Sequence, residues 1–331
     1  MTDRDAPGTS ADLSWRLDDT TVDATLVRPA GSGPFPAVVM VAGSGPTDRD
    51  WTSPLLPGTN GGARLLAEAL AGAGFASLRY DKRVVGPHAR ENLLALMGKL
   101  SMASHREELA SAIQTLAEQP GIRRDRIFGL GNSEGTLHLL NYQTAHPAIP
   151  LAGLVLIGPP GRAVGAVART QLAEQAAAIP NGDALLALYD RAIARFEAGE
   201  PMNPDPALPE GVQMLLKSLE APVNQPFSRE LWLADAAAPL AQVAVPVLVV
   251  IGKKDVQVDW HADGAPLEQV AAGHPNVTVR YPENANHILK EERRSRAELV
   301  PAAAETGYNE PGTHLDPEGL ADILGWLGAH V

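Results

Sequence analysis

The stretch Leu130-Gly131-Asn132-Ser133-Glu134-Gly135-Thr136 places a serine between two glycines, where an apolar run ends and a helical pattern begins. Residues 126–130 have the composition of a short buried strand, and residues 136–142 continue with the apolar face of a helix. A strand-to-helix turn this tight strains the serine backbone, and side chains two residues to either side would collide there. Glycine at both positions removes that collision. The stretch therefore predicts a nucleophile elbow and not a chance loop serine.

A hydrolytic serine needs a base and an acid that orients it, and both follow later in the chain. Residues 247–252 form a continuous apolar run, typical of a parallel strand covered on both faces, and Asp255 follows its end. Residues 277–281 alternate like a last strand, and the next loop carries His287. The chain order Ser133, Asp255, His287 is the order expected of an α/β-hydrolase fold.

Other residues could fill these roles. Asp259 lies four residues beyond Asp255, and His314 also lies downstream of the acid. We expect Asp255 to be the acid because it follows its strand more directly. The other histidines lack a comparable context, and we expect them on the surface or in packing: His88, His105, His138, His146, His261, His274 and His330.

The loop after an early strand is the other part that such a site requires. Residues 37–41 form that strand, and the loop Ala42-Gly43-Ser44-Gly45-Pro46 follows. Its glycines allow the backbone to approach a ligand closely. We expect the backbone N–H groups of Ser44 and Glu134 to form an oxyanion hole.

Three motifs of the chain resemble those of a family of α/β-hydrolase carboxylesterases, which carry G-S-G-P-x-D-R-D, Y-D-K-R-G and an elbow G-H-S-E-G. Residues 43–50 read GSGPTDRD, residues 80–84 read YDKRV, and residues 131–135 read GNSEG. The resemblance extends from about residue 15 to the C-terminus and is loose in the middle third. It implies that Ser133, Asp255 and His287 form the catalytic triad.

The chain departs from this pattern at three positions, of which 42 and 132 flank the predicted oxyanion hole. Asn132 replaces the elbow histidine, Val84 replaces a glycine, and Ala42 stands where many esterases of the wider fold carry a histidine. The charged residues of the first two motifs are expected to form ion pairs that brace the loops, because carboxylates without nearby histidines are weak evidence for a metal site. These residues are Asp48, Arg49, Asp50, Asp81, Lys82 and Arg83.

Composition limits the remaining function classes. The 331 residues, 45% of them hydrophobic, suffice for one large core and an inserted subdomain. The net charge of −12 disfavours nucleic acids and anionic membranes as partners, and the absence of cysteine excludes thiolate chemistry. The chain shows no signal peptide and no apolar stretch long enough to span a membrane, which predicts a cytoplasmic protein. The glycines at 129, 131 and 135 do not match a dinucleotide loop, so we expect neither a cofactor nor a metal.

Alternating strand and helix patterns predict a mostly parallel central sheet flanked by helices. Residues 159–240 are helical and rich in alanine and leucine, and we expect them to form a cap between two core segments, residues 1–158 and 241–331. Such a cap would cover the serine and supply an apolar pocket. The expected activity is hydrolysis of a small-molecule ester through an acyl-enzyme. The alternatives are a peptidase, thioesterase or acyltransferase with the same triad, and a catalytically silent binding protein. The sequence specifies neither the acyl and alcohol groups nor the oligomeric state.

Overall fold

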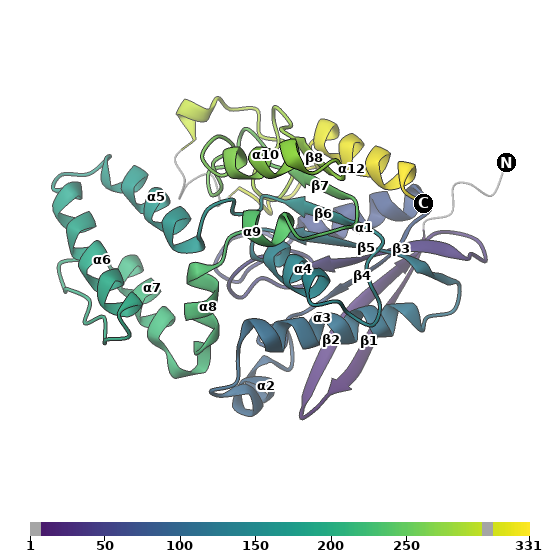
Figure 1. Cartoon of the computed structure of the whole chain (residues 1–331), viewed down its shortest axis with the longest axis horizontal. Coiled ribbons are helices and arrows are strands. Elements are labelled where there is room, and N and C mark those ends of the chain that lie inside the picture. Colours follow the sequence, from purple (N-terminus) through teal and green to yellow (C-terminus); the bar gives the residue numbers. More distant parts are fainter. Residues whose placement is uncertain (1–7, 300–306) are drawn as a thin grey trace.

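A computed structural model describes residues 8–299 and 307–331 of the chain, and its centre is one sheet (Figure 1). Within these residues the sheet has eight strands in the order β1-β2-β4-β3-β5-β6-β7-β8. β1 and β2 pair antiparallel, as do β2 and β4, and the later neighbours are all parallel. The strands are β1 (Thr9–Leu17), β2 (Thr20–Arg28), β3 (Phe35–Val41), β4 (Ala76–Tyr80), β5 (Ile122–Asn132), β6 (Leu154–Ile157), β7 (Val247–Val250) and β8 (Val277–Arg280).

Helices cover both faces of the sheet, as the apolar strands require. In β3, Val39 and Val41 pack into one apolar cluster while Val38 and Met40 pack into another, because successive side chains of a strand point to opposite faces. One face is covered by α1 (Gly62–Gly72) and α12 (Pro317–Ala329). The other is covered by α3 (Met102–Ala117), α4 (Glu134–Thr144), α9 (Ala237–Leu240) and α10 (Gly264–Gly273). The predicted architecture of a mostly parallel sheet flanked by helices is confirmed.

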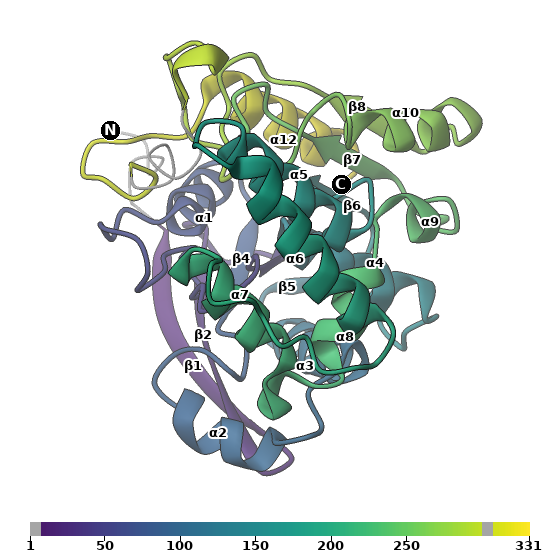
Figure 2. The ribbon, with the colours of Figure 1, turned by 90° about the vertical axis from the view of Figure 1, so that its left-hand side faces the viewer.

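The chain between β6 and β7 adds a separate group of helices. α5 (Val164–Ala176), α6 (Gly182–Glu197), α7 (Glu210–Glu220) and α8 (Phe227–Leu233) share their own apolar cluster, which includes Tyr189, Phe196, Leu216 and Trp232. Figure 2 shows these helices in front of the sheet. α9, by contrast, packs Leu240 into the main core. The division of the chain at residues 159 and 240 into core and cap stays a prediction.

The described residues also form the helix α2 (Ala89–Leu96) and the short 3-10 helices η1 (Pro222–Asn224) and η2 (Arg296–Glu298). A capping box fixes the start of α3 at Met102. The Ser101 hydroxyl accepts from Ser104 N, and the Ser104 hydroxyl accepts from Ser101 N. Among the described residues, no helix combines the length and the apolar character needed to cross a bilayer.

The predicted site residues follow strands whose carboxyl ends share one edge of the sheet. β3 leads into Gly43, β5 into Ser133, β6 into Gly158 and β7 into Asp255. These strands are parallel neighbours, so their carboxyl ends lie side by side. In open α/β sheets this edge is where ligands bind.

Candidate active site

Ser133 occupies the turn between β5 and α4, with φ 53° and ψ −123°. This positive φ is rare for a residue with a side chain and marks a strained backbone. A Cβ on Gly131 would lie 2.7 Å from the carbonyl carbon of Gly135, and a Cβ on Gly135 would lie 2.4 Å from the oxygen of Val41. Both glycines are therefore required by backbone contacts, as the sequence pattern predicts. The Ser133 side chain is only partly buried.

Asp255 and His287 are in direct contact. Asp255 Oδ2 lies 2.8 Å from His287 Nδ1, and both residues are buried. An ionised carboxylate only accepts hydrogen bonds, so Nδ1–H of the imidazole is the donor. The other carboxylate oxygen accepts from the backbone N–H groups of Gln257 and Val258, which hold the acid in place. In the predicted triad, Nε2 of His287 is then the nitrogen that would take the proton of the nucleophile.

The histidine loop is fastened to the elbow by backbone and side-chain contacts. The Asn132 side chain donates to the carbonyl of His287 at 2.8 Å. Ser133 N donates to the carbonyl of Ile157 at 2.8 Å. A Cβ on the next residue, Gly158, would lie 3.1 Å from His287 Nδ1. The elbow and the Asp255–His287 pair thus meet across the end of β6, although the triad role of the three residues stays a prediction.

The loop after β3 passes directly beside the elbow. A Cβ on Gly43 would lie 3.2 Å from Ser133 Cβ, so there is no room for a side chain between Gly43 and the serine. Glu134 is the first residue of α4, where backbone N–H groups and the helix dipole favour negative charge. Ser44 and Glu134 therefore lie on elements adjacent to Ser133. Their role as the oxyanion hole stays a prediction.

The two competing residues have other contacts. Asp259 Oδ1 accepts from the backbone N–H groups of His261 and Ala262, so this carboxylate closes its own turn. His314 Nε2 lies 2.8 Å from Glu291 Oε2 and is mostly exposed. The structure therefore pairs His287 with Asp255 and gives Asp259 and His314 different surroundings.

The charged motif residues form ion pairs within the protein. Arg49 pairs with Asp81 at 2.8 Å and Asp50 with Arg79 at 2.5 Å. The remaining pairs are Lys82 with Glu134 at 2.9 Å and Arg83 with Glu108 at 3.5 Å, while Asp48 Oδ1 accepts from Asp50 N and Thr52 N. This is the bracing role expected from the sequence. Within residues 8–299 and 307–331, no group of three His, Asp or Glu side chains has the arrangement of a metal site.

An apolar cavity of about 300 Å³ lies among α5, α6 and α7. Its lining includes Ala168, Leu172, Leu186, Leu208 and Val212, but neither Ser133 nor His287. Another lining residue, Gln171, donates to the carbonyl of Gln257 at 2.7 Å, and Gln257 N donates to Asp255. The cavity therefore adjoins the loop that carries the acid.

Sequence reasoning missed two features of the site. It treated Asn132 only as a departure from the motif, whereas its amide bonds the His287 carbonyl. It expected His138 on the surface or in packing, and His138 is indeed buried, but it did not predict that His138 lies 3.1 Å from Glu134 Oε1. The i, i+4 spacing of Glu134 and His138 on a helix is the signal that indicates this second contact.

A model of the alpha/beta hydrolase family matches residues 38–296. The chain belongs to this family. Esterase EstD of Thermotoga maritima is 27% identical to this hydrolase over 319 residues, which cover 95% of this chain and 68% of the other.

Solved structures share the fold at low sequence identity. An esterase of Pyrococcus furiosus has a TM-score of 0.57 and 16% identity, over 99% of this chain and 94% of that one. A proline iminopeptidase of Mycobacterium smegmatis has a TM-score of 0.55 and 16% identity, over 97% and 98% of the two chains. At this identity, the two likenesses show the alpha/beta hydrolase fold alone.

Proposed function

We propose that this alpha/beta hydrolase is a serine carboxylesterase that cleaves small-molecule esters through an acyl-enzyme. The observation that carries the proposal is the 2.8 Å contact between Asp255 and His287, at the sheet edge where the strained Ser133 turn lies. The three sequence motifs and the 27% identity to a protein named as an esterase support the same activity. Fold similarity alone would not distinguish it from other hydrolases.

In the proposed mechanism, His287 takes the Ser133 proton as the serine oxygen forms a bond to the ester carbonyl carbon. The carbonyl electron pair moves onto its oxygen, which the N–H groups of Ser44 and Glu134 would stabilise. Collapse of this intermediate breaks the bond to the alcohol, which leaves with the proton from His287. Water then attacks the acyl-enzyme by the same route, releases the carboxylic acid and restores Ser133. Asp255 holds the imidazole tautomer and stabilises its protonated form.

The helices α5–α8 form the cap in this proposal, and their cavity receives the apolar part of the substrate. The bond from Gln171 to Gln257 connects the cavity lining to the acid loop. Apolar pockets with a few polar groups are the usual form of small-molecule sites. The cavity therefore favours an ester with an apolar acyl or alcohol group.

Labelling with a fluorophosphonate probe tests the proposal, because the probe reacts with an activated serine. We expect the wild-type protein to label at Ser133 and Ser133→Ala not to label. The variant should keep the wild-type melting temperature and lose at least about 10³-fold in kcat on p-nitrophenyl butyrate. A catalytically silent binding protein would give no label. More than about a tenth of wild-type kcat in the variant would contradict the assignment.

A substrate panel then separates esterase activity from that of enzymes sharing the triad. p-Nitrophenyl esters of rising chain length are compared with matched thioesters and aminoacyl amides. We expect kcat/KM to be highest for the oxygen esters. A higher value for the amides or thioesters would instead assign a peptidase or a thioesterase.

A further inference from the structure

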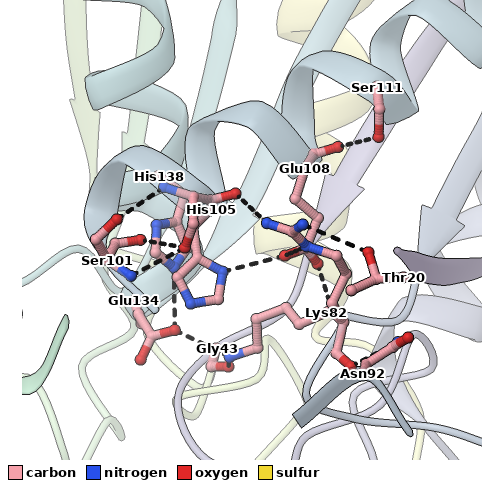
Figure 3. A network of polar contacts seen from close by, with 12 residues as sticks. Thr20, Gly43, Lys82, Asn92, Ser101, His105, Glu108, Ser111, Glu134 and His138 are labelled. Atoms are coloured by element: carbon pink, nitrogen blue, oxygen red, sulfur yellow. Dashed lines mark hydrogen bonds and ion pairs between the residues drawn. The ribbon is translucent and has the colours of Figure 1, made fainter. Parts of the chain in front are cut away.

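The Lys82 side chain is buried and ends between two parts of the proposed oxyanion hole. Its ammonium donates to the carbonyl of Gly43 at 2.6 Å and to Glu134 Oε1 at 2.9 Å (Figure 3). Lys82 is 3% exposed and Glu134 is 4% exposed. Burial removes the ammonium from water, and these two hydrogen bonds, one of them to a carboxylate, offset the lost hydration.

The Gly43 carbonyl and the Ser44 N–H belong to the same peptide unit. This peptide bond is trans, so its C=O and its N–H point in opposite directions. A hydrogen bond to the carbonyl therefore fixes the direction of the Ser44 N–H. The ammonium also polarises the peptide, and a polarised amide is a stronger donor.

The second partner of Lys82 leads to the other half of the hole. Glu134 supplies the second proposed N–H, and its carboxylate also accepts from His138 Nε2 at 3.1 Å. Burial alone would raise the pKa of Glu134, but the Lys82 ammonium and the His138 bond outweigh it and hold this pKa well below its usual range. Glu134 is therefore ionised at neutral pH and keeps Lys82 in place.

We propose that Lys82 is a positioning residue for ester hydrolysis: it orients the Gly43–Ser44 peptide toward the oxyanion and ties it to the elbow through Glu134. This rests on the proposed esterase function. It also explains how the hole is supported although Ala42 and Asn132 replace the histidines of related motifs. The support comes from a buried cation behind the loop.

A neighbouring ion pair provides a matched control. Arg83 and Glu108 are buried to a similar extent as Lys82 and Glu134. Arg83 lies in the same loop as Lys82, and Glu108 lies in α3, which packs against α4. Glu108 accepts from Arg83 N at 2.7 Å, and the Arg83 guanidinium donates to the carbonyl of Ser104 at 2.8 Å. The pair is similar in kind, and within the described residues its hydrogen bonds and ion pairs involve neither Gly43 nor Ser133. Glu108 also lies 3.3 Å from Nδ1 of His105, whose ring packs against that of His138.

The test compares two double variants in which each ion pair is made neutral, Lys82→Met/Glu134→Gln and Arg83→Met/Glu108→Gln. Removing both charges avoids leaving one of them buried without a partner. For each, kcat and KM on p-nitrophenyl butyrate are measured per active site titrated with the fluorophosphonate. Inhibition by a trifluoromethyl ketone is measured in parallel. The serine adds to the carbonyl of this ketone, and the resulting hemiketal places an oxyanion in the hole.

We expect the Lys82 double variant to lose about 10- to 100-fold in kcat with KM within about threefold, because only the transition state uses the hole. The affinity for the ketone should fall by a similar factor. The Arg83 double variant should lose thermal stability but keep kcat within about threefold. Equal losses of kcat in the two double variants, or an unchanged ketone affinity in the Lys82 variant, would overturn the proposal.

A single variant covers the case in which the Lys82 double variant does not fold. Lys82→Arg keeps the charge beside Glu134 but replaces the compact ammonium with a planar fork that donates from other positions. We expect at least about a fivefold loss of kcat with little change in KM. Wild-type kcat in a folded Lys82→Arg protein would overturn the inference. If Ser133→Ala stays active, the esterase proposal itself fails, whereas an inactive Ser133→Ala beside an unaffected Lys82 variant rejects only the positioning role.

Discussion

The side-chain amide of Asn132 donates a 2.8 Å hydrogen bond to the backbone carbonyl of His287, so the residue before the proposed nucleophile holds the loop of the proposed base. The same amide lies 3.4 Å from the carbonyl of Ile157. Asn132 is buried at the end of β5. The asparagine that departs from the related elbow motif therefore links two residues of the proposed triad.

Asn132→Ala should separate the histidine loop from the elbow. The buried His287 carbonyl would lose its partner, which we expect to cost about 1–3 kcal/mol in the free energy of unfolding. We also expect kcat to fall about tenfold, because small misplacements of catalytic groups are costly. Urea denaturation and ester kinetics measure the two effects. Asn276→Ala removes a surface bond to the Ala244 carbonyl and should leave kcat unchanged. Equal kcat in both variants would contradict the role of Asn132.

The identity of the acid is tested by a pair of isosteric changes. Asp255→Asn removes the charge that faces His287 Nδ1 and favours the wrong tautomer, so kcat should fall by roughly 10²–10⁴. Asp259→Asn keeps an oxygen for its two backbone bonds, and kcat should stay within about twofold. Steady-state kinetics on one ester checks both variants. An equal or greater loss at Asp259 would reverse the assignment.

The elbow glycines should not tolerate even one methyl group. Gly135→Ala would place a Cβ 2.4 Å from the Val41 oxygen, so the backbone of the turn must move. We expect a loss of more than about 3 kcal/mol in the free energy of unfolding. Gly325→Ala in α12 meets nothing within 4 Å and should stabilise by about 0.5–1 kcal/mol through helix propensity. Thermal and urea denaturation compare the stability of the two variants. A stable, active Gly135→Ala protein would show that the turn accommodates a Cβ at residue 135.

Burial lowers the pKa of His138, which packs against the rings of His105 and Phe227. In the unfolded chain this histidine takes up a proton at about pH 6.5, while in the folded protein it stays neutral to lower pH. The unfolded state therefore binds more protons below about pH 6.5, and stability falls as the pH drops. The depressed pKa of Glu134 acts in the same direction below about pH 4.5.

Urea denaturation between pH 7.5 and 5 measures this effect. The slope should reach up to about 1.4 kcal/mol per pH unit from His138 alone. His138→Gln should make the slope shallower. His261→Gln, a change at an exposed position, should leave the slope unchanged. A slope unaffected by His138→Gln would show that this histidine does not carry the pH dependence.

The cavity among α5, α6 and α7 gives a prediction about chain length. Ala168→Phe adds a ring to the cavity lining. We expect kcat/KM for p-nitrophenyl octanoate to fall at least about tenfold while that for the acetate stays within about threefold, because only the longer chain needs the filled space. The ratio between the two esters corrects for changes in protein concentration or stability. An unchanged ratio would show that the cavity does not bind the acyl chain of the substrate.

Local features of the sequence predicted the elbow, the covered parallel strands and the contact between Asp255 and His287. The glycines around Ser133 follow from sterics that act over four residues, and the apolar strands follow from a period that is visible in the chain. The Asp255–His287 contact follows because residues after parallel strands collect at one edge of the sheet. These relationships need no knowledge of how distant helices pack.

Only the tertiary structure decided which distant groups meet behind the site. Asn132 reaches the carbonyl of His287 across 155 positions, and Lys82 reaches that of Gly43 across 39. Backbone carbonyls have no sequence signature, since every residue carries one. The charge pattern indicated that Lys82 would be paired, but many carboxylates could satisfy that rule. The choice of Glu134 and the Gly43 peptide depends on the parallel pairing of β3 with β4 and on the packing of α4 against β3. Burial there makes one arrangement far more favourable than the others.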